Sequence, residues 1–290
     1  MGGKHDYLFT KTAWERLSYA VFGALSAGRA ILEIYEASDF GVRKKSDGSP
    51  LTHADEAANA CIQAAIGHLE IPVLSEEGAA LPFDVRRDWD LLWIVDPLDG
   101  TKEFISRNGE FTVNIALVEN QTPILGVVFV PVSDTLYFSD PAQAFRVDAC
   151  GKVMPDLGPS PPDPVSFLLP LMEKAVRLPL PQDPERPFTV MGSRSHATPE
   201  LAAYVDAIRQ AHPDLAFISA GSSLKICRVA EGRADIYPRL GPTMEWDTAA
   251  GQAIAAASGA RMIQYPDGPP LVYNKPDLRN PWFVVTTGNG

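Results

Sequence analysis

Apolar side chains recur at steps of three and four along the first part of the chain. Between residues 10 and 36 they are Trp14, Leu17, Val21, Leu25, Leu32 and Tyr35. This spacing places them on one face and predicts a long amphipathic helix. Gly28 fills the one gap in the series, and a glycine inside a helix weakens it slightly.

A second helix is predicted after a polar, glycine-bearing loop over residues 44–50. Thr52 stands three residues before Asp55, which is the pattern of a capping box at a helix start. The buried face of this helix is expected to be Ala58, Cys61, Ala65 and Leu69. Cys61 is therefore interpreted as a small core residue.

In the middle of the chain the pattern of apolar residues changes from the helical spacing to short runs that are typical of strands. Residues 91–95 form an apolar run that predicts a short buried strand, ending in a turn at Pro97. Further runs separated by turn residues cover 111–118, 124–132, 135–139 and 144–147. Helices followed by hairpin-linked strands are typical of an α+β first half.

A proline-rich stretch over residues 155–187 separates this half from the rest. It is interpreted as a linker with a short helix near 168–177. Beyond it, strands are predicted over 188–191, 215–219, 234–237 and 283–287, and helices over 199–210, 222–231 and 246–258. This alternation predicts an α/β unit. We expect an N-terminal α+β domain over 1–155 and a C-terminal α/β domain over 156–290.

Charge and cysteine content narrow the class of protein. The net charge of −11 disfavours sequence-independent nucleic-acid binding. Three scattered cysteines show neither metal-ligand spacing nor a disulfide framework. The apolar runs are far shorter than the ~18 residues of a membrane span, and the start of the chain lacks the apolar core of a signal peptide. A cytoplasmic protein without an integral membrane segment is expected, with peripheral membrane association left open.

The most informative segment is an acidic motif at the end of the 91–95 run. It brings Asp96 and Asp99, three residues apart, to the carboxyl end of a strand. Gly100 permits close backbone approach, and a helix starting at Thr101 would point bare amides at a phosphate. Carboxylate oxygens beside such amides suit Mg²⁺ with a phosphate ester. The alternative is an Asx turn with a capping aspartate.

Two further acidic positions fit the same chemistry. The pair Glu76 and Glu77 follows the apolar run 71–74, and the spacing alone allows either as a ligand. Asp247 opens a helix whose residues 253–260 are rich in alanine, serine and glycine, which allows tight packing. Taken singly, each position is more typical of a solvated acid or a helix cap.

In combination these motifs resemble the inositol-monophosphatase-like phosphatases, which are magnesium-dependent and lithium-sensitive. The resemblance covers nearly the whole chain, and its motifs are residues 47–55, 75–77, 96–101 and 246–251. It implies the layered αβαβα sandwich of the inositol monophosphatase and fructose-1,6-bisphosphatase type, with both α+β and α/β parts.

The second half of the chain resembles one branch of this superfamily. Segments 192–196, 221–225 and 234–239 are similar to those of the CysQ-type 3'(2'),5'-bisphosphate nucleotidases. This resemblance implies hydrolysis of the 3'-phosphate of adenosine 3',5'-bisphosphate to AMP, a reaction linked to sulfate assimilation. The same segments supply hydroxyls, Arg194, His196, Lys225 and Arg239 for a second phosphate.

The resemblance also implies a metal site with two or three Mg²⁺ ions. One ion is expected on Glu76, Asp96 and the Leu98 carbonyl, and a second on Asp96, Asp99 and Asp247. A third would share Glu76 with waters. Glu76 is preferred to Glu77 because the family ligand is the first of the pair.

Roles in the reaction follow from the same resemblance. Asp55 and Thr101 are expected to position and deprotonate an attacking water. The expected substrate contacts are Glu76, Leu98, Asp99, Gly100, Thr101, Ser193, His196, Ser222, Lys225, Arg239 and Asp247. The expected partner is a small nucleotide, and the chain is expected to be a monomer or homodimer.

Two alternative functions stay open at this point. An inositol monophosphatase or related sugar phosphatase would keep every metal ligand without needing Lys225 or Arg239. A non-catalytic metal- and nucleotide-binding regulator would not need Asp55 or Thr101. The sequence offers no role for Glu245, which directly precedes Trp246.

Overall fold

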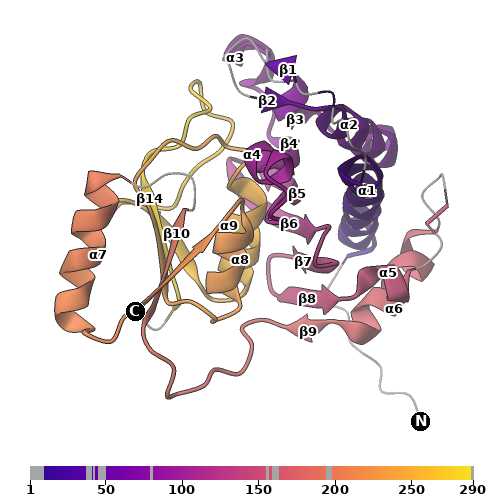
Figure 1. The fold of residues 1–290 in the computed structure, drawn as a ribbon. Coiled ribbons are helices and arrows are strands. Elements are labelled where there is room, and N and C mark those ends of the chain that lie inside the picture. The colour runs from indigo at the N-terminus through magenta and orange to yellow at the C-terminus, as the bar shows by residue number, and fades with distance from the viewer. Residues whose placement is uncertain are drawn as a thin grey trace.

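A computed structural model describes residues 10–36, 41, 43–44, 50–78, 81–154, 157–158, 163–193 and 198–288. Five layers follow one another across the molecule (Figure 1). Two N-terminal helices cover a seven-stranded sheet, two further helices lie between it and a five-stranded sheet, and a last helix covers the outer face. The expected αβαβα sandwich is therefore present.

The outer N-terminal layer consists of α1 (Lys11–Tyr35) and α2 (His53–Ile66). The capping box of α2 is formed, because the Asp55 carboxylate accepts from the Thr52 amide at 2.7 Å. Ile62 is buried on this helix, whereas Cys61 is only half-buried. Cys61 packs against the core from this partly buried position, so the expectation that it is a core residue is met in part.

Helix α1 is long and apolar enough to cross a membrane by length and composition alone. Its apolar residues are nevertheless buried in the interior, with Leu17, Val21 and Ile31 fully covered. They pack with residues of α2 and of the larger sheet. The helix has the environment of a core helix in a globular protein.

The larger sheet has the strand order β3-β4-β5-β6-β7-β8-β9. Its strands are β3 (Val73–Ser75), β4 (Leu91–Asp99), β5 (Thr112–Glu119), β6 (Thr122–Val130), β7 (Thr135–Ser139), β8 (Ala144–Asp148) and β9 (Val176–Arg177). Only β3 and β4 are parallel, and the others form the expected antiparallel meander. A two-stranded ribbon, β1 (Arg43–Lys44) with β2 (Pro50–Leu51), precedes α2.

The smaller sheet has the order β11-β10-β12-β14-β13. Its strands are β10 (Thr189–Ser193), β11 (Ala216–Ala220), β12 (Ile236–Arg239), β13 (Arg261–Gln264) and β14 (Phe283–Thr286). Helices α8 (Leu224–Ala230) and α9 (Ala249–Ala257) face the larger sheet, and α7 (Pro199–Ala211) covers the other side. The remaining α-helices of the described residues are α3 (Phe83–Arg86), α4 (Thr101–Ile105), α5 (Cys150–Val153) and α6 (Pro164–Lys174).

Several element boundaries differ from the sequence-based expectations. Strand β4 continues through Asp99 with a register shift between Asp96 and Asp99, so Pro97 lies in a bulge and not in a terminal turn. Helix α6 begins at Pro164, where the Asp163 carboxylate caps the Ser166 amide at 2.9 Å. Helix α9 begins at Ala249 and not at 246.

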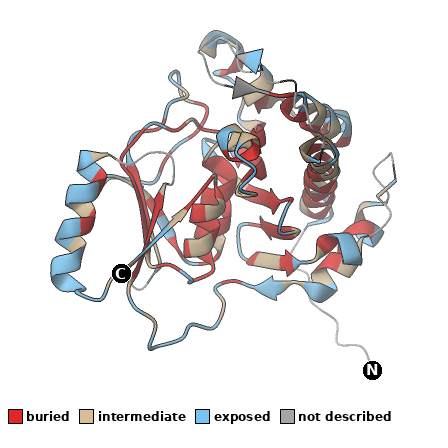
Figure 2. Ribbon diagram, viewed as in Figure 1, coloured by how far each residue is buried: buried red, intermediate tan, exposed pale blue. Residues whose placement is uncertain are grey.

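Burial alternates between the two faces of the larger sheet, as expected for period-two strands. Val95 and Ile115 face the N-terminal helices, whereas Ile94 and Ala116 face α8 and α9. Figure 2 shows these inner layers as buried and the outer side of α7 as exposed. A side chain at Gly126 on β6 would collide with the Ala250 carbonyl, so α9 lies directly against the sheet. This close packing fixes the helix that follows Asp247.

Candidate metal centre and substrate pocket

The bulge in β4 sets the direction of two carboxylates. Asp96 is buried, and its Oδ1 accepts from the Leu98 amide at 3.0 Å. Asp99 follows the bulge, where its Oδ2 accepts from the Ser223 amide and hydroxyl, both at 2.7 Å. A bulge re-aims side chains that a regular strand would send to fixed faces. Both aspartates thereby face the junction between the two sheets.

Glu76, Asp96 and Asp247 form a compact group. One carboxylate oxygen from each lies within 4.8 Å of the others. Glu76 opens the 3₁₀ turn after β3, which is the parallel neighbour of β4. Asp247 arrives from the other half of the chain, and its Oδ2 accepts from the Met244 amide at 2.9 Å. The group includes Glu76 and not Glu77, and Asp99 lies outside it.

The electrostatics of this group favours binding of a cation. Burial, followed by the charges of Glu76, Asp99 and Asp247, raises the pKa of Asp96 well above its ordinary value. Burial and Asp99 raise the pKa of Asp247 to about 8. Like charges at this separation disfavour joint ionisation unless a metal compensates them. Hard carboxylate oxygens in this number suit Mg²⁺.

Asp55 and Thr101 meet beside the metal-ligand candidates. The Thr101 hydroxyl lies 3.4 Å from Asp55 Oδ1 and 3.5 Å from the Leu98 carbonyl oxygen. Asp55 Oδ2 is held by the Thr52 amide and hydroxyl. Gly100, with a φ of 92°, turns the chain from β4 into α4 just before Thr101. The expected helix at Thr101 is therefore present, as one short turn.

A cavity of about 250 Å³ opens at this junction. Of the expected site residues, it is lined by Glu76, Asp99, Gly100, Thr101, Ser193, Ser222, Lys225, Arg239 and Asp247. Asp55, Asp96 and Leu98 are buried and do not line it. His196 and Arg194 lie outside the described residues. The structure thus brings most of the candidates to one cavity.

Two buried cations belong to the same cavity. Lys225 is 4% exposed, and its ammonium donates to the carbonyls of Ser222 at 2.7 Å and Ala220 at 3.2 Å. Burial lowers the pKa of Lys225 to about 8, while Asp99 opposes the shift. Arg239 donates to the Pro242 carbonyl at 2.7 Å, and its buried Nε has no partner within the described part of the chain. Each cation retains hydrogen-bonding capacity for a ligand.

Comparison with known proteins identifies the family of this chain. The sequence profile of the inositol monophosphatase family matches residues 14–282. The chain belongs to this family. A 3'(2'),5'-bisphosphate nucleotidase CysQ from Escherichia coli K12 is 42% identical over 267 residues, covering 91% of this chain and 96% of that protein.

Solved structures of family members resemble the structure of this chain. CysQ from Bacteroides thetaiotaomicron, described as a bacterial member of the family, matches with a TM-score of 0.82 and 49% identity, over 93% of this chain and 96% of that one. The IMPase of Thermotoga maritima matches with a TM-score of 0.69 at 19% identity, over 94% and 92% of the two chains, which shows the fold alone. The family, its CysQ-type branch and the fold expected from the motifs are therefore confirmed.

Sequence reasoning missed two polar residues of this family member's site. Ser223 donates its hydroxyl to Asp99 or to the Asp247 carbonyl, each at 2.7 Å, so it links the two halves. Asn114 on β5 donates to Ser223 at 2.8 Å and to Asp99 at 3.3 Å. Ser222 was singled out instead, yet it has a φ of 46° and forms the turn. Two adjacent serines carry no sequence signal that tells these roles apart.

Proposed function

We propose that this protein is a Mg²⁺-dependent phosphatase that removes the 3'-phosphate of adenosine 3',5'-bisphosphate, releasing AMP and phosphate. The observation that carries the proposal is a single cavity lined both by the carboxylates Glu76, Asp99 and Asp247 and by the buried cations Lys225 and Arg239. A substrate with two phosphates can use both sets of groups. The names of the relatives with 42–49% identity support the same reaction.

The proposed ligands of two or three Mg²⁺ ions are Glu76, Asp96, Asp99, Asp247 and the Leu98 carbonyl. Their burial and mutual repulsion support this assignment. When bound, Mg²⁺ supplies a Lewis acid and a means of activating water at neutral pH. Asp99 orients the opposite wall of the site through its hydrogen bonds to Ser223.

Asp55 and Thr101 are proposed to orient the attacking water and accept its proton. The Thr101 hydroxyl contacts both Asp55 and the Leu98 carbonyl, so it can relay a proton between the site and the carboxylate. Asp55 lies in the first turn of α2, where the helix dipole favours its ionised form. Direct attack by water requires no covalent intermediate.

The two phosphates are proposed to occupy different parts of the cavity. The 3'-phosphate would lie at the carboxylates and the Gly100–Thr101 turn. The 5'-phosphate would bind Ser222, Lys225 and Arg239, with Ser193 near the nucleoside. Contacts to the phosphate that does not react orient the ester and raise turnover as well as binding.

A phosphate-release panel tests the proposed function. The substrates are adenosine 3',5'-bisphosphate, adenosine 3'-monophosphate and inositol 1-phosphate, each with Mg²⁺ and with excess chelator. We expect kcat/KM to be highest for the bisphosphate and to vanish in chelator. A preference for inositol 1-phosphate would favour a sugar phosphatase. The absence of sustained release from every substrate would favour a non-catalytic regulator.

A further inference from the structure

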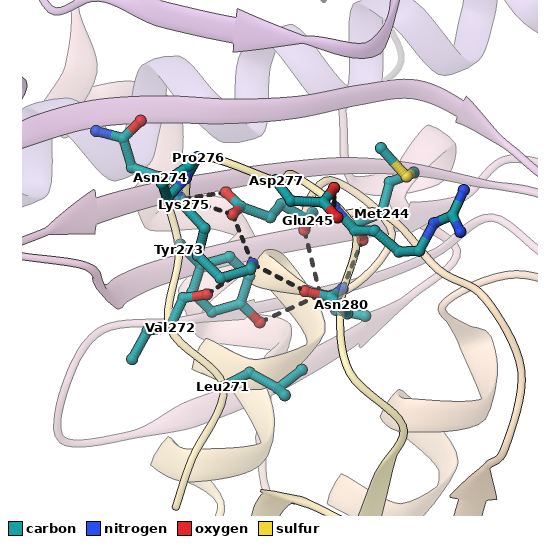
Figure 3. Close-up of polar contacts among 12 residues, drawn as sticks. Met244, Glu245, Leu271, Val272, Tyr273, Asn274, Lys275, Pro276, Asp277 and Asn280 are labelled. Carbon is teal, nitrogen blue, oxygen red and sulfur yellow. Dashed lines mark hydrogen bonds and ion pairs between the residues drawn. The ribbon is translucent and has the colours of Figure 1, made fainter. Parts of the chain in front are cut away.

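A buried ion pair lies directly behind the turn that carries Asp247. We call residues 271–280 the clamp loop; this loop runs alongside the 244–249 turn (Figure 3). Glu245 is fully buried, and its carboxylate accepts from the amides of Asn274 at 2.6 Å and Lys275 at 3.0 Å. The Lys275 ammonium completes the pair at 2.6 Å. Glu245 does not line the cavity, so its partners are the clamp loop and not the substrate.

The clamp loop holds the turn on both sides of Asp247. Besides Glu245, the Lys275 ammonium donates to the Val272 carbonyl at 2.9 Å and to the Asn280 side-chain oxygen at 3.3 Å. The Asn280 amide group in turn donates to the Met244 carbonyl at 2.8 Å (Figure 3). It also donates to the Thr248 hydroxyl at 2.9 Å. Met244 and Glu245 before Asp247 and Thr248 after it are thus tied to one loop.

The other side of the clamp loop is tied to α3, which precedes β4 of the larger sheet. Arg86, buried at the end of α3, donates to the Asn274 side-chain oxygen at 2.9 Å and to the Lys275 carbonyl at 2.7 Å. The Asn274 amide group returns a bond to the Arg86 carbonyl at 2.7 Å. Strand β4, which carries Asp96, begins five residues later at Leu91. A continuous hydrogen-bonded path therefore runs from the approach to β4 to the Asp247 turn.

This path bears on the metal ligands because they come from opposite halves of the chain. Glu76 follows β3 and Asp96 lies in β4 of the larger sheet, whereas Asp247 lies between β12 of the smaller sheet and α9. Their carboxylates repel one another at the separations observed. Whenever all three are ionised, this repulsion favours movement of the Asp247 turn away from the other two ligands, and an attachment that fixes the turn opposes that movement.

We propose that Glu245 is a positioning residue. Its ion pair with Lys275 fixes the clamp loop to the 244–249 turn and keeps the Asp247 carboxylate close enough to those of Glu76 and Asp96 for the three to bind one cation. The inference rests on the proposed metal site. Glu245 thereby raises the affinity of the site for a cation, through the backbone of the 244–249 turn, in addition to any contribution to the stability of the fold. Groups that orient metal ligands from outside typically change affinity by about 10- to 100-fold when altered.

The test compares Mg²⁺ binding to metal-free wild-type protein and to Glu245→Gln by titration calorimetry. The glutamine keeps the shape but places an amide group against the donors of Lys275. We expect the dissociation constant to rise by roughly 10- to 100-fold. We also expect activity to return towards the wild-type value at high Mg²⁺. An unchanged dissociation constant would overturn the proposal.

Glu231→Gln is the matched control. Like Glu245, Glu231 is fully buried and does not line the cavity, but its cationic partners are Arg146 at 2.8 Å and Arg228 at 3.0 Å and not the clamp loop. Both variants should lower the melting temperature, and only Glu245→Gln should weaken Mg²⁺ binding. Equal weakening in both would mean that loss of stability alone explains the effect.

Lys275→Met tests the same positioning role if Glu245→Gln does not fold. It leaves Glu245 its two backbone amides, and we expect the same weakening of Mg²⁺ binding. Wild-type affinity in a folded Lys275→Met protein would overturn the proposal. Failure of the wild-type protein itself to bind Mg²⁺ would refute the metal site and with it the proposed function, which is a different outcome.

Discussion

Replacing Lys225 by methionine removes one positive charge from the cavity wall and keeps a side chain of similar length. The ammonium is buried and is held by the carbonyls of Ala220 and Ser222. It therefore points in a fixed direction, and the lysine side chain loses little conformational entropy when a 5'-phosphate binds it. The substitution tests whether this cation recognises the second phosphate.

The size of the effect follows from the contact that is lost. A charge-assisted hydrogen bond contributes about 1.5–3 kcal/mol, which is roughly ten- to hundredfold in kcat/KM. Adenosine 3'-monophosphate lacks the 5'-phosphate and should be affected much less. The two carbonyl contacts are lost with both substrates, so the ratio of the two kcat/KM values isolates the phosphate contact.

The pH dependence of the same ratio gives a second measurement. Because burial lowers the pKa of Lys225 to about 8, the side chain is charged below this value and neutral above it. The preference of the wild-type protein for the bisphosphate should fall as pH rises through 8, and Lys225→Met should show no such fall. Phosphate release from both substrates measures this. Equal losses on both substrates at every pH would refute the reasoning.

Three further outcomes are expected. Asp96→Asn should abolish Mg²⁺-dependent phosphate release yet raise the melting temperature in chelator, because one repelling carboxylate is gone; a lower melting temperature would contradict this. The pKa of Asp247 in the folded protein is raised to about 8, so metal-free protein should lose stability as pH rises from about 4 to 8. Mg²⁺ should therefore raise the melting temperature more at pH 8 than at pH 5. A stability of the metal-free protein that rises over this pH range would contradict the prediction. Thr101→Val should lower kcat while Thr101→Ser retains it, and an unchanged kcat in the valine variant would exclude the hydroxyl from the reaction.

Much of the site could be predicted because its acids follow apolar runs. Glu76 directly follows β3, Asp96 lies near the carboxyl end of the neighbouring β4, and the carboxyl ends of parallel strands meet at one edge. Thr52 and Asp55 form a local capping box that depends on no distant residue. Where the structure depends on neighbours in sequence, pattern and propensity were sufficient.

The remaining features depend on contacts distant in sequence. Strand β13 (Arg261–Gln264) has polar ends and was missed, because it is defined by pairing with β14. Glu245 offered no local signal, since its partners lie 29 and 30 residues further along. The bulge at Pro97 also escaped prediction, because the pairing of Asp96 with Asn114 and of Asp99 with Thr112 creates it.

The identity of the nucleotide product tests the central claim most directly. Adenosine 3',5'-bisphosphate is incubated with the protein and Mg²⁺, and the products are separated by chromatography against authentic standards. If the carboxylate cluster acts on the 3'-phosphate while Lys225 and Arg239 hold the other, the product is adenosine 5'-monophosphate with one equivalent of phosphate. Accumulation of adenosine 3'-monophosphate would show that the two phosphates bind the other way round and would contradict the account.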